Sequence, residues 1–136
     1  MKGIPQTLTS VKGIGPVYAA GLIAEIGDIH RFDDHHALAK YAGLVWSQYQ
    51  SGEYEAEDTS RMLTGNKYLR YYLVQASDAI RKYDTEYKAF YQKKYKEVTK
   101  HQHKRALVLT ARKLVRLVHS LLRTKQLYIP KEERRE

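Results

Sequence analysis

The chain has 136 residues, 43% of them apolar, which is enough for one folded domain with its own core. It contains no cysteine, which excludes disulfides, thiolate metal sites and cysteine nucleophiles and favours a reducing, cytoplasmic setting. No apolar run near its start suits a signal peptide, and the most apolar stretch, residues 17–24, is far too short to span a membrane.

The positive charge is concentrated in the second half of the chain. Residues 1–66 contain 5 Lys/Arg and 8 Asp/Glu, whereas residues 67–136 contain 19 Lys/Arg and 7 Asp/Glu, so the two parts carry net charges of −3 and +12. This asymmetry favours a polyanionic partner, a nucleic acid, contacted by the second half. A solvated basic surface that only keeps the protein soluble is the alternative.

The first segment predicts short helices around a glycine-containing hairpin. An apolar pair at residues 8 and 11 precedes the tight turn of residues 13–16, whose proline suits the first position of the next helix. Residues 17–26 predict that helix, and Gly27 predicts its end. A third helix is expected over residues 34–41, with an aspartate as its N-cap.

Residues 44–65 interrupt the helical pattern. Residues 45–50 alternate between apolar and polar types, which favours an extended segment, and an acidic stretch follows. In so small a domain a connection of this length is usually functional or disordered.

Everything after Asn66 predicts helices. The first helix has a predicted buried stripe of Leu69, Leu73, Ala76, Ile80 and Tyr83. The second is rich in aromatic residues: Tyr87, Phe90, Tyr91, Tyr95 and Val98 mark its face. The third, over residues 104–124, has a predicted core face of Leu107, Ala111, Leu114, Val118 and Leu121. The predicted fold class is therefore all-α: a helix-hairpin-helix-like N-terminal part plus a bundle of longer helices, with a domain over residues 4–128 and a disordered charged tail over residues 129–136.

Four arginines of the last helix lie within about 40° of one line on its predicted outer face. This arginine stripe consists of Arg105, Arg112, Arg116 and Arg123. The chain has no acidic residue between Lys100 and Tyr128 that could pair with them, so phosphate is the natural counterion. The alternative is an ordinary solvated helix face.

The hairpin offers a second candidate for phosphate contact, through Lys12, Gly13 and Gly15, because such turns can aim backbone N–H groups at a phosphate. A simple tight turn between two packed helices explains the same residues. The histidines carry less information: the adjacent His35 and His36 are expected to point in different directions on a helix. No metal site is expected in this domain.

Several short motifs, taken in order, resemble the C-terminal domain of the IS110/IS116/IS902 family of transposases over about residues 4–125. The motifs are residues 13–16, 24–28, Phe32, 38–44, Ser51-Gly52, 65–70 and 111–114. The resemblance implies a helical domain that supplies a serine, here Ser51, as the nucleophile of DNA strand cleavage and exchange. It also adds Lys67 and Arg70, from the motif at residues 65–70, as expected DNA contacts.

The resemblance further implies partners that this chain lacks. They are an N-terminal RuvC-like domain, whose acidic residues hold a divalent metal expected to be Mg, a structured guide RNA, and further copies of the protein in a homo-oligomer. No cofactor is expected in the domain itself, which on its own should be inactive. In the cell the whole protein is expected in the cytoplasm, associated with the nucleoid.

Two other classes of function stay open. The chain could be a non-enzymatic helix-hairpin-helix DNA-binding module in which Ser51 is only a loop residue. It could also be a protein-assembly domain, in which the aromatic helix around residues 87–95 packs against another subunit.

Overall fold

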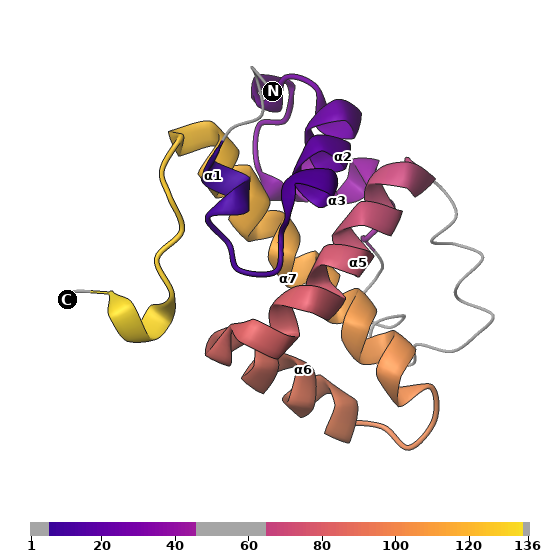
Figure 1. Cartoon of the computed structure of the whole chain (residues 1–136). Coiled ribbons are helices and arrows are strands. Elements are labelled where there is room, and N and C mark those ends of the chain that lie inside the picture. Colours follow the sequence, from indigo (N-terminus) through magenta and orange to yellow (C-terminus); the bar gives the residue numbers. More distant parts are fainter. Residues whose placement is uncertain (1–5, 46–64, 135–136) are drawn as a thin grey trace.

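The computed structural model describes residues 6–45 and 65–134 (Figure 1). These residues contain six α-helices, two 3-10 helices and no β-strand, which confirms the all-α prediction. The elements are α1 (Gln6–Thr9), α2 (Pro16–Ile26), η1 (Ile29–Arg31), α3 (His35–Tyr41), α5 (Lys67–Tyr83), α6 (Thr85–Lys96), α7 (Gln102–Thr124) and η3 (Lys131–Glu133).

Helices α2 and α3 begin and end within one residue of the predicted bounds, whereas α1 ends at Thr9, before Val11 of the predicted apolar pair. Pro16 is the first residue of α2, and Gly27 ends it with φ 69° and an N–H that donates to Ile23 O. Asp34 is the N-cap of α3, because its carboxylate accepts from the N–H of Ala37 at 2.9 Å. The assignment of α1, the turn and α2 to a helix-hairpin-helix motif stays a prediction.

Segment 13–25 runs antiparallel to α5. Gly13 lies against Ile80, Gly21 lies under the ring of Tyr72, and Glu25 accepts a hydrogen bond from Asn66. As the residue number rises in the first segment it falls in α5, which fixes their antiparallel order. Both glycines allow an approach that a β-carbon would obstruct.

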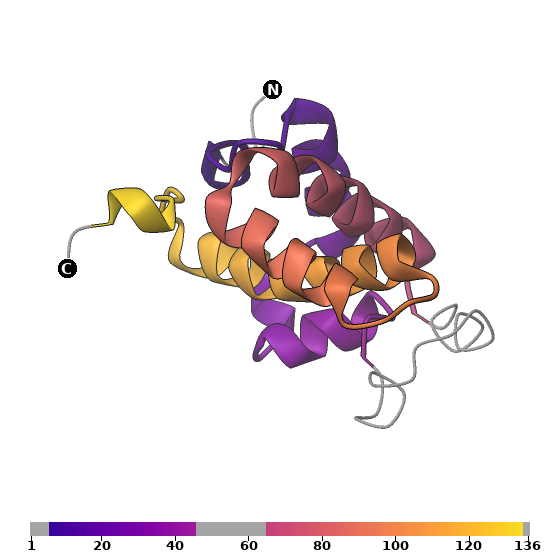
Figure 2. The same ribbon diagram turned by 90° about the horizontal axis from the view of Figure 1, so that it is seen from below.

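Helix α7 is the central element of the domain. It packs against α5 and α6 and also against α3 and η1 (Figure 2). It therefore buries more of its circumference than the predicted core face: Val108 and Val115 are buried in addition to Ala111, Leu114, Val118 and Leu121. Leu107, predicted in the core, is only partly buried.

The predicted stripe of α5 is correct for Leu69, Leu73, Ala76 and Ile80, each with 0% of its surface exposed. Tyr83 is the exception: it is the last residue of α5, beyond the packed turns, and is 58% exposed. In α6, Tyr87 and Tyr91 are buried, whereas the helix ends at Lys96, before Val98.

Beyond α7 the chain returns to the body of the domain at Tyr128. Tyr128 is buried, its hydroxyl donates to the Asp84 carboxylate, and its N–H donates to the Ser10 hydroxyl. Residues 131–133 form η3, and Glu132 accepts from the hydroxyl of Thr85. The domain boundary at residue 128 stays a prediction. Among the described helices, none combines the length and apolar character that a membrane span needs.

Candidate nucleic-acid interface and loop anchor

The predicted nucleophile, Ser51, lies in segment 46–64, outside the described residues, but the residues that flank this segment form a defined cluster. A β-carbon on Gly65 would lie 2.7 Å from Tyr41 O and 2.8 Å from Gly43 N, and the N–H of Asn66 donates to Tyr41 O. Gly65 has φ +87°, a conformation that favours glycine. The described residues on either side of the segment therefore meet at the end of α3.

Asn66 ties three elements together at this point. Its side-chain oxygen accepts from the N–H groups of Tyr68 at 2.9 Å and Leu69 at 3.0 Å, which caps α5. Its amide nitrogen donates to the Glu25 carboxylate at 3.0 Å and to the Tyr41 hydroxyl at 3.2 Å. Glu25, Tyr41, Gly43, Gly65 and Asn66 all belong to the motifs of the sequence analysis; we call this cluster the loop anchor.

A cation reinforces the loop anchor. The Arg31 guanidinium lies 4.7 Å from the centroids of both the Phe32 and Tyr41 rings. The hydrogen bond from Asn66 and the interaction with Arg31 lower the pKa of the Tyr41 hydroxyl below its usual range. The anchor is thus a polar, hydrogen-bonded site.

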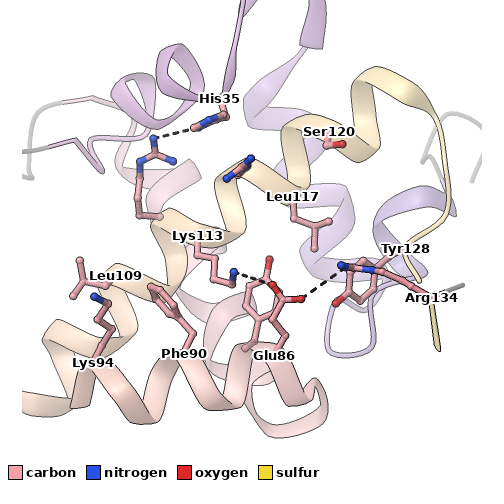
Figure 3. Close-up of a pocket in the computed structure, with 13 residues that line it drawn as sticks. His35, Glu86, Phe90, Lys94, Leu109, Lys113, Leu117, Ser120, Tyr128 and Arg134 are labelled. Carbon is pink, nitrogen blue, oxygen red and sulfur yellow. Dashed lines mark hydrogen bonds and ion pairs between the residues drawn. The ribbon is translucent and has the colours of Figure 1, made fainter. Parts of the chain in front are cut away.

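A second feature is a groove of 620 Å³ along α7, bordered by α3 on one side and α6 on the other (Figure 3). We call it the basic groove, because five of its lining residues are cationic: Lys94, Arg112, Lys113, Arg116 and Arg134. Among the described residues that line it, one is acidic, Glu86, and it is paired with Lys113 at 3.0 Å and with Arg134 at 3.8 Å (Figure 3).

Among the described residues that line the groove, no carboxylate forms an ion pair with Arg112 or Arg116. Burial, and then the repulsion from Arg116, lower the pKa of Arg112 from its usual value, although a guanidinium remains charged. A nearby anion would relieve this repulsion, and phosphate fits the fork of guanidinium donors.

Two histidines hold Arg112 at the edge of the groove. The rings of His35 and His36 are stacked, with centroids 4.5 Å apart. The Nδ1 atoms of both face the same nitrogen of Arg112, at 3.2 and 3.1 Å. The expectation that the two side chains point in different directions is wrong, because both begin in the first turn of α3, where they reach across to α7.

Arg105 does not belong to an exposed arginine stripe, which corrects the sequence analysis. It is 6% exposed, donates to Lys94 O at 2.9 Å and forms an ion pair with Glu97 at 2.9 Å. It thus caps the carbonyl end of α6. The stripe fails here because α6 covers the side of α7 that the sequence pattern leaves free.

The remaining predicted DNA contacts lie in three separate places. Arg123 lies at the far end of α7, where it approaches the carbonyl oxygens of Phe32 and Asp33 at 3.4 and 3.5 Å. Lys67 and Arg70 are in the first turns of α5, and Arg70 donates to Ala42 O. Lys12, with Gly13 and Gly15, lies near the opposite end of α5, where its ammonium is 5.7 Å from the Tyr83 ring centroid.

The structure therefore brings Arg112 and Arg116 into one site and leaves the other predicted contacts outside it. Sequence reasoning missed Lys113, Lys94, Arg134 and His35 as groove residues. For α7 a signal was present, because the residues that it contributes recur at helical spacing: Leu109, Arg112, Lys113, Arg116, Leu117 and Ser120. The contributions of α3, α6 and η3 depend on tertiary packing, which no local pattern predicts.

Comparison with known proteins gives the class of protein to which the chain belongs. Residues 5–92, more than half of the chain, match the model of the Transposase IS116/IS110/IS902 family. The chain therefore belongs to this family of insertion-sequence transposases, which confirms the family found in the sequence, whereas the C-terminal placement stays a prediction.

Three relatives support the assignment. The chain is 40% identical over 73 residues to a putative transposase, y4rJ, of Sinorhizobium fredii, a match that covers 54% of this chain and 18% of that protein. It is 29% identical over 125 residues to an uncharacterized 44.8 kDa protein of insertion element IS116 of Streptomyces clavuligerus, covering 92% and 31%. It is 33% identical over 75 residues to the transposase of IS1111A of Coxiella burnetii, covering 55% and 20%.

The matches span less than a third of the length of each of these relatives. No solved structure matches the chain.

Proposed function

We propose that this chain is the C-terminal, serine-bearing part of a transposase, and that Ser51 is the nucleophile of DNA strand exchange. The observation that supports the proposal most strongly is the loop anchor. Three motif segments that are far apart in the sequence meet at Asn66, at the base of the segment that contains Ser51. A fixed base is what a nucleophile on a long connection requires for positioning.

The basic groove is the proposed seat of a nucleic-acid backbone. Arg112 and Arg116 would contact phosphate oxygens, and the walls formed by Phe90 and Leu117 would lie against sugars. His35 at the edge of the groove and Tyr41 in the loop anchor are the two ends of α3, about 9 Å apart along its axis. A strand in the groove could thus continue toward the segment that contains Ser51.

The proposed chemistry is a transesterification. The Ser51 oxygen attacks a backbone phosphorus, an Oγ–P bond forms, and the bond from phosphorus to one deoxyribose oxygen breaks. The proton lost by the serine is balanced by the proton that the leaving oxygen takes up. Attack by a second DNA hydroxyl on the phosphoserine reverses these steps and joins the strands.

Within the described residues, no group of three His, Asp or Glu side chains is arranged as metal ligands would be. A divalent metal, with Mg as the expected ion, would be held by an N-terminal RuvC-like domain in the same protein. A structured guide RNA and further copies of the protein are the other proposed partners.

The test is strand exchange by the full-length transposase, with its RNA, carrying Ser51→Ala. We expect cleavage and exchange to be lost while DNA binding is retained, because a methyl group cannot replace a nucleophilic hydroxyl. Protein–DNA adducts of the parent should map by mass spectrometry to the peptide containing Ser51. Ser47→Ala and Ser60→Ala are matched controls from the same segment and should remain active.

Two outcomes would contradict the proposal. Adducts at Ser47, Ser60 or Tyr49 would move the nucleophile to another residue. Normal exchange by the Ser51→Ala protein would leave the chain as a DNA-binding module without a catalytic serine.

A further inference from the structure

Two tyrosines in the first turns of α5 are exposed, although the stripe of this helix that begins at Leu69 is fully buried. Tyr68 is 60% exposed and Tyr71 is 57% exposed, whereas Leu69 between them is fully buried. Residues three apart lie on the same side of a helix, so the two rings share one face of α5. We call Tyr68 and Tyr71, together with Lys67, the tyrosine patch.

The Tyr71 ring of the tyrosine patch packs against a ring that lies on α2. The Tyr72 ring lies directly over Gly21 of α2, where a β-carbon would come within 2.5 Å of it. The Tyr71 ring meets Tyr72 edge-on, with centroids 5.6 Å apart at 72°. Tyr68 lies two residues after the capping residue Asn66, and its backbone N–H donates to the Asn66 side-chain oxygen. The Tyr71 ring thus rests on a packed ring, and the backbone of Tyr68 is fixed by the helix cap.

The surroundings of the patch favour an anionic, aromatic ligand over an apolar protein surface. The Lys67 ammonium is 5.3 Å from the Tyr68 ring centroid, and the first turn of α5 contains no acidic residue. A shallow hollow of 540 Å³ lies beside Tyr68, lined by Tyr41, Gly65, Asn66 and Lys67. It places the Lys67 ammonium next to an exposed ring, whereas a protein-binding patch usually surrounds its tyrosines with apolar side chains.

We propose that the tyrosine patch is a stacking site for unpaired bases of single-stranded nucleic acid. Tyr68 and Tyr71 stack with successive bases, and Lys67 contacts the phosphate between them; stacking on aromatic rings suits any base. This inference rests on the proposed function in that the partner is nucleic acid. It adds a second contact, which binds unpaired bases and so distinguishes a single strand from a duplex. This contact lies on α5, apart from the basic groove on α7.

The test measures binding of this chain to a labelled 12-nucleotide single strand, to the same strand with abasic sites, and to the corresponding duplex. DNA and RNA strands are both used, because each carries unpaired bases. We expect the parent to bind the base-containing strand about tenfold or more tightly than the abasic one. Tyr68→Ala with Tyr71→Ala should abolish this preference and leave duplex binding unchanged. Tyr68→Phe with Tyr71→Phe should retain the preference, because the rings remain.

Equal affinity of the parent for base-containing and abasic strands would overturn the proposal. So would an alanine variant that binds the single strand as the parent does. If that variant instead loses assembly of the full-length protein while strand binding is unchanged, the patch is a protein contact. These results are separate from those at Ser51, which concern cleavage. They also differ from the effect of charge reversal in the basic groove, which should weaken the binding of base-containing and abasic strands alike.

Discussion

Gly13 lies against the backbone of Ile80, so closely that a β-carbon at residue 13 would be 2.9 Å from the Ile80 nitrogen. This contact joins the turn before α2 to the end of α5. Gly13 also has φ +112°, which L-amino acids with a side chain rarely adopt. Gly15, two residues later, has φ −82°, and a β-carbon there would meet no atom within 4 Å. The two glycines of the hairpin therefore have different roles.

The first prediction is that Gly13→Ala lowers the free energy of unfolding by about 2–4 kcal/mol, because it adds backbone strain and a clash with Ile80. The matched change Gly15→Ala should cost at most about 1 kcal/mol, since it affects only a helix N-cap. Urea unfolding of both variants measures the difference. Equal losses, or a larger loss at Gly15, would contradict this description of the turn.

The sequence identified this hairpin but did not show which of its two glycines has positive φ. Spacing alone shows that a tight turn needs glycine, whereas which glycine has positive φ depends on how the turn meets α5, 67 residues away in the sequence from Gly13 to Ile80. The local features were predictable because neighbouring residues determine them, whereas long-range contacts depend on tertiary packing. The pattern of neighbouring residues predicts helix caps such as Asp34 and the buried stripe of α5.

The second prediction concerns the basic groove. Arg112→Glu with Arg116→Glu should weaken binding of duplex DNA by this chain and reduce the slope of log K against log salt by about 2, one for each lost phosphate contact. Lys40→Glu with Lys82→Glu is the control, because both lysines are exposed, neither lines the groove, and the change in net charge is the same. If both pairs reduce the slope equally, only net charge matters and the groove is not the binding site.

The third prediction separates Arg105 from the other members of the arginine stripe. Arg105→Ala should lower the free energy of unfolding by about 1–3 kcal/mol, because Glu97 and the Lys94 carbonyl lose their partner. Arg116→Ala, at an exposed position, should change stability by less than about 0.5 kcal/mol. The order should reverse for DNA binding, where only Arg116→Ala lowers affinity. Thermal unfolding and a binding titration on the same two proteins give both comparisons.

The candidate site was predictable only where a single element forms it. Arg112 and Arg116 were found because they lie one turn apart on α7. Arg105 was wrongly placed on the outer face because the sequence of α7 does not indicate that α6 ends beside it. The loop anchor needs Glu25, Tyr41 and Asn66 to meet from three elements. Family motifs marked these residues, but their mutual contact follows from tertiary packing alone.

The last prediction concerns His35 and pH. Burial, and then the charge of Arg112, lower the pKa of His35 in the folded chain below its ordinary value of 6.5. His36 and Arg116 act in the same direction, and Asp34 opposes them. The folded state therefore favours the neutral ring, which accepts a hydrogen bond from Arg112. Its contribution to stability is fully present above pH 6.5 and is lost as the pH falls toward the lower pKa of the folded state.

The chain should consequently lose stability between about pH 7 and pH 5 more steeply than a His35→Asn variant. Asparagine places an oxygen acceptor near the position of Nδ1 but does not titrate in this range, so Arg112 keeps a partner in the variant. The slopes of unfolding free energy against pH should differ by no more than one proton, about 1.4 kcal/mol per pH unit. Urea unfolding at several pH values measures both slopes. Parallel slopes would show that His35 does not change its protonation on unfolding, and that its contact with Arg112 does not depend on the neutral ring.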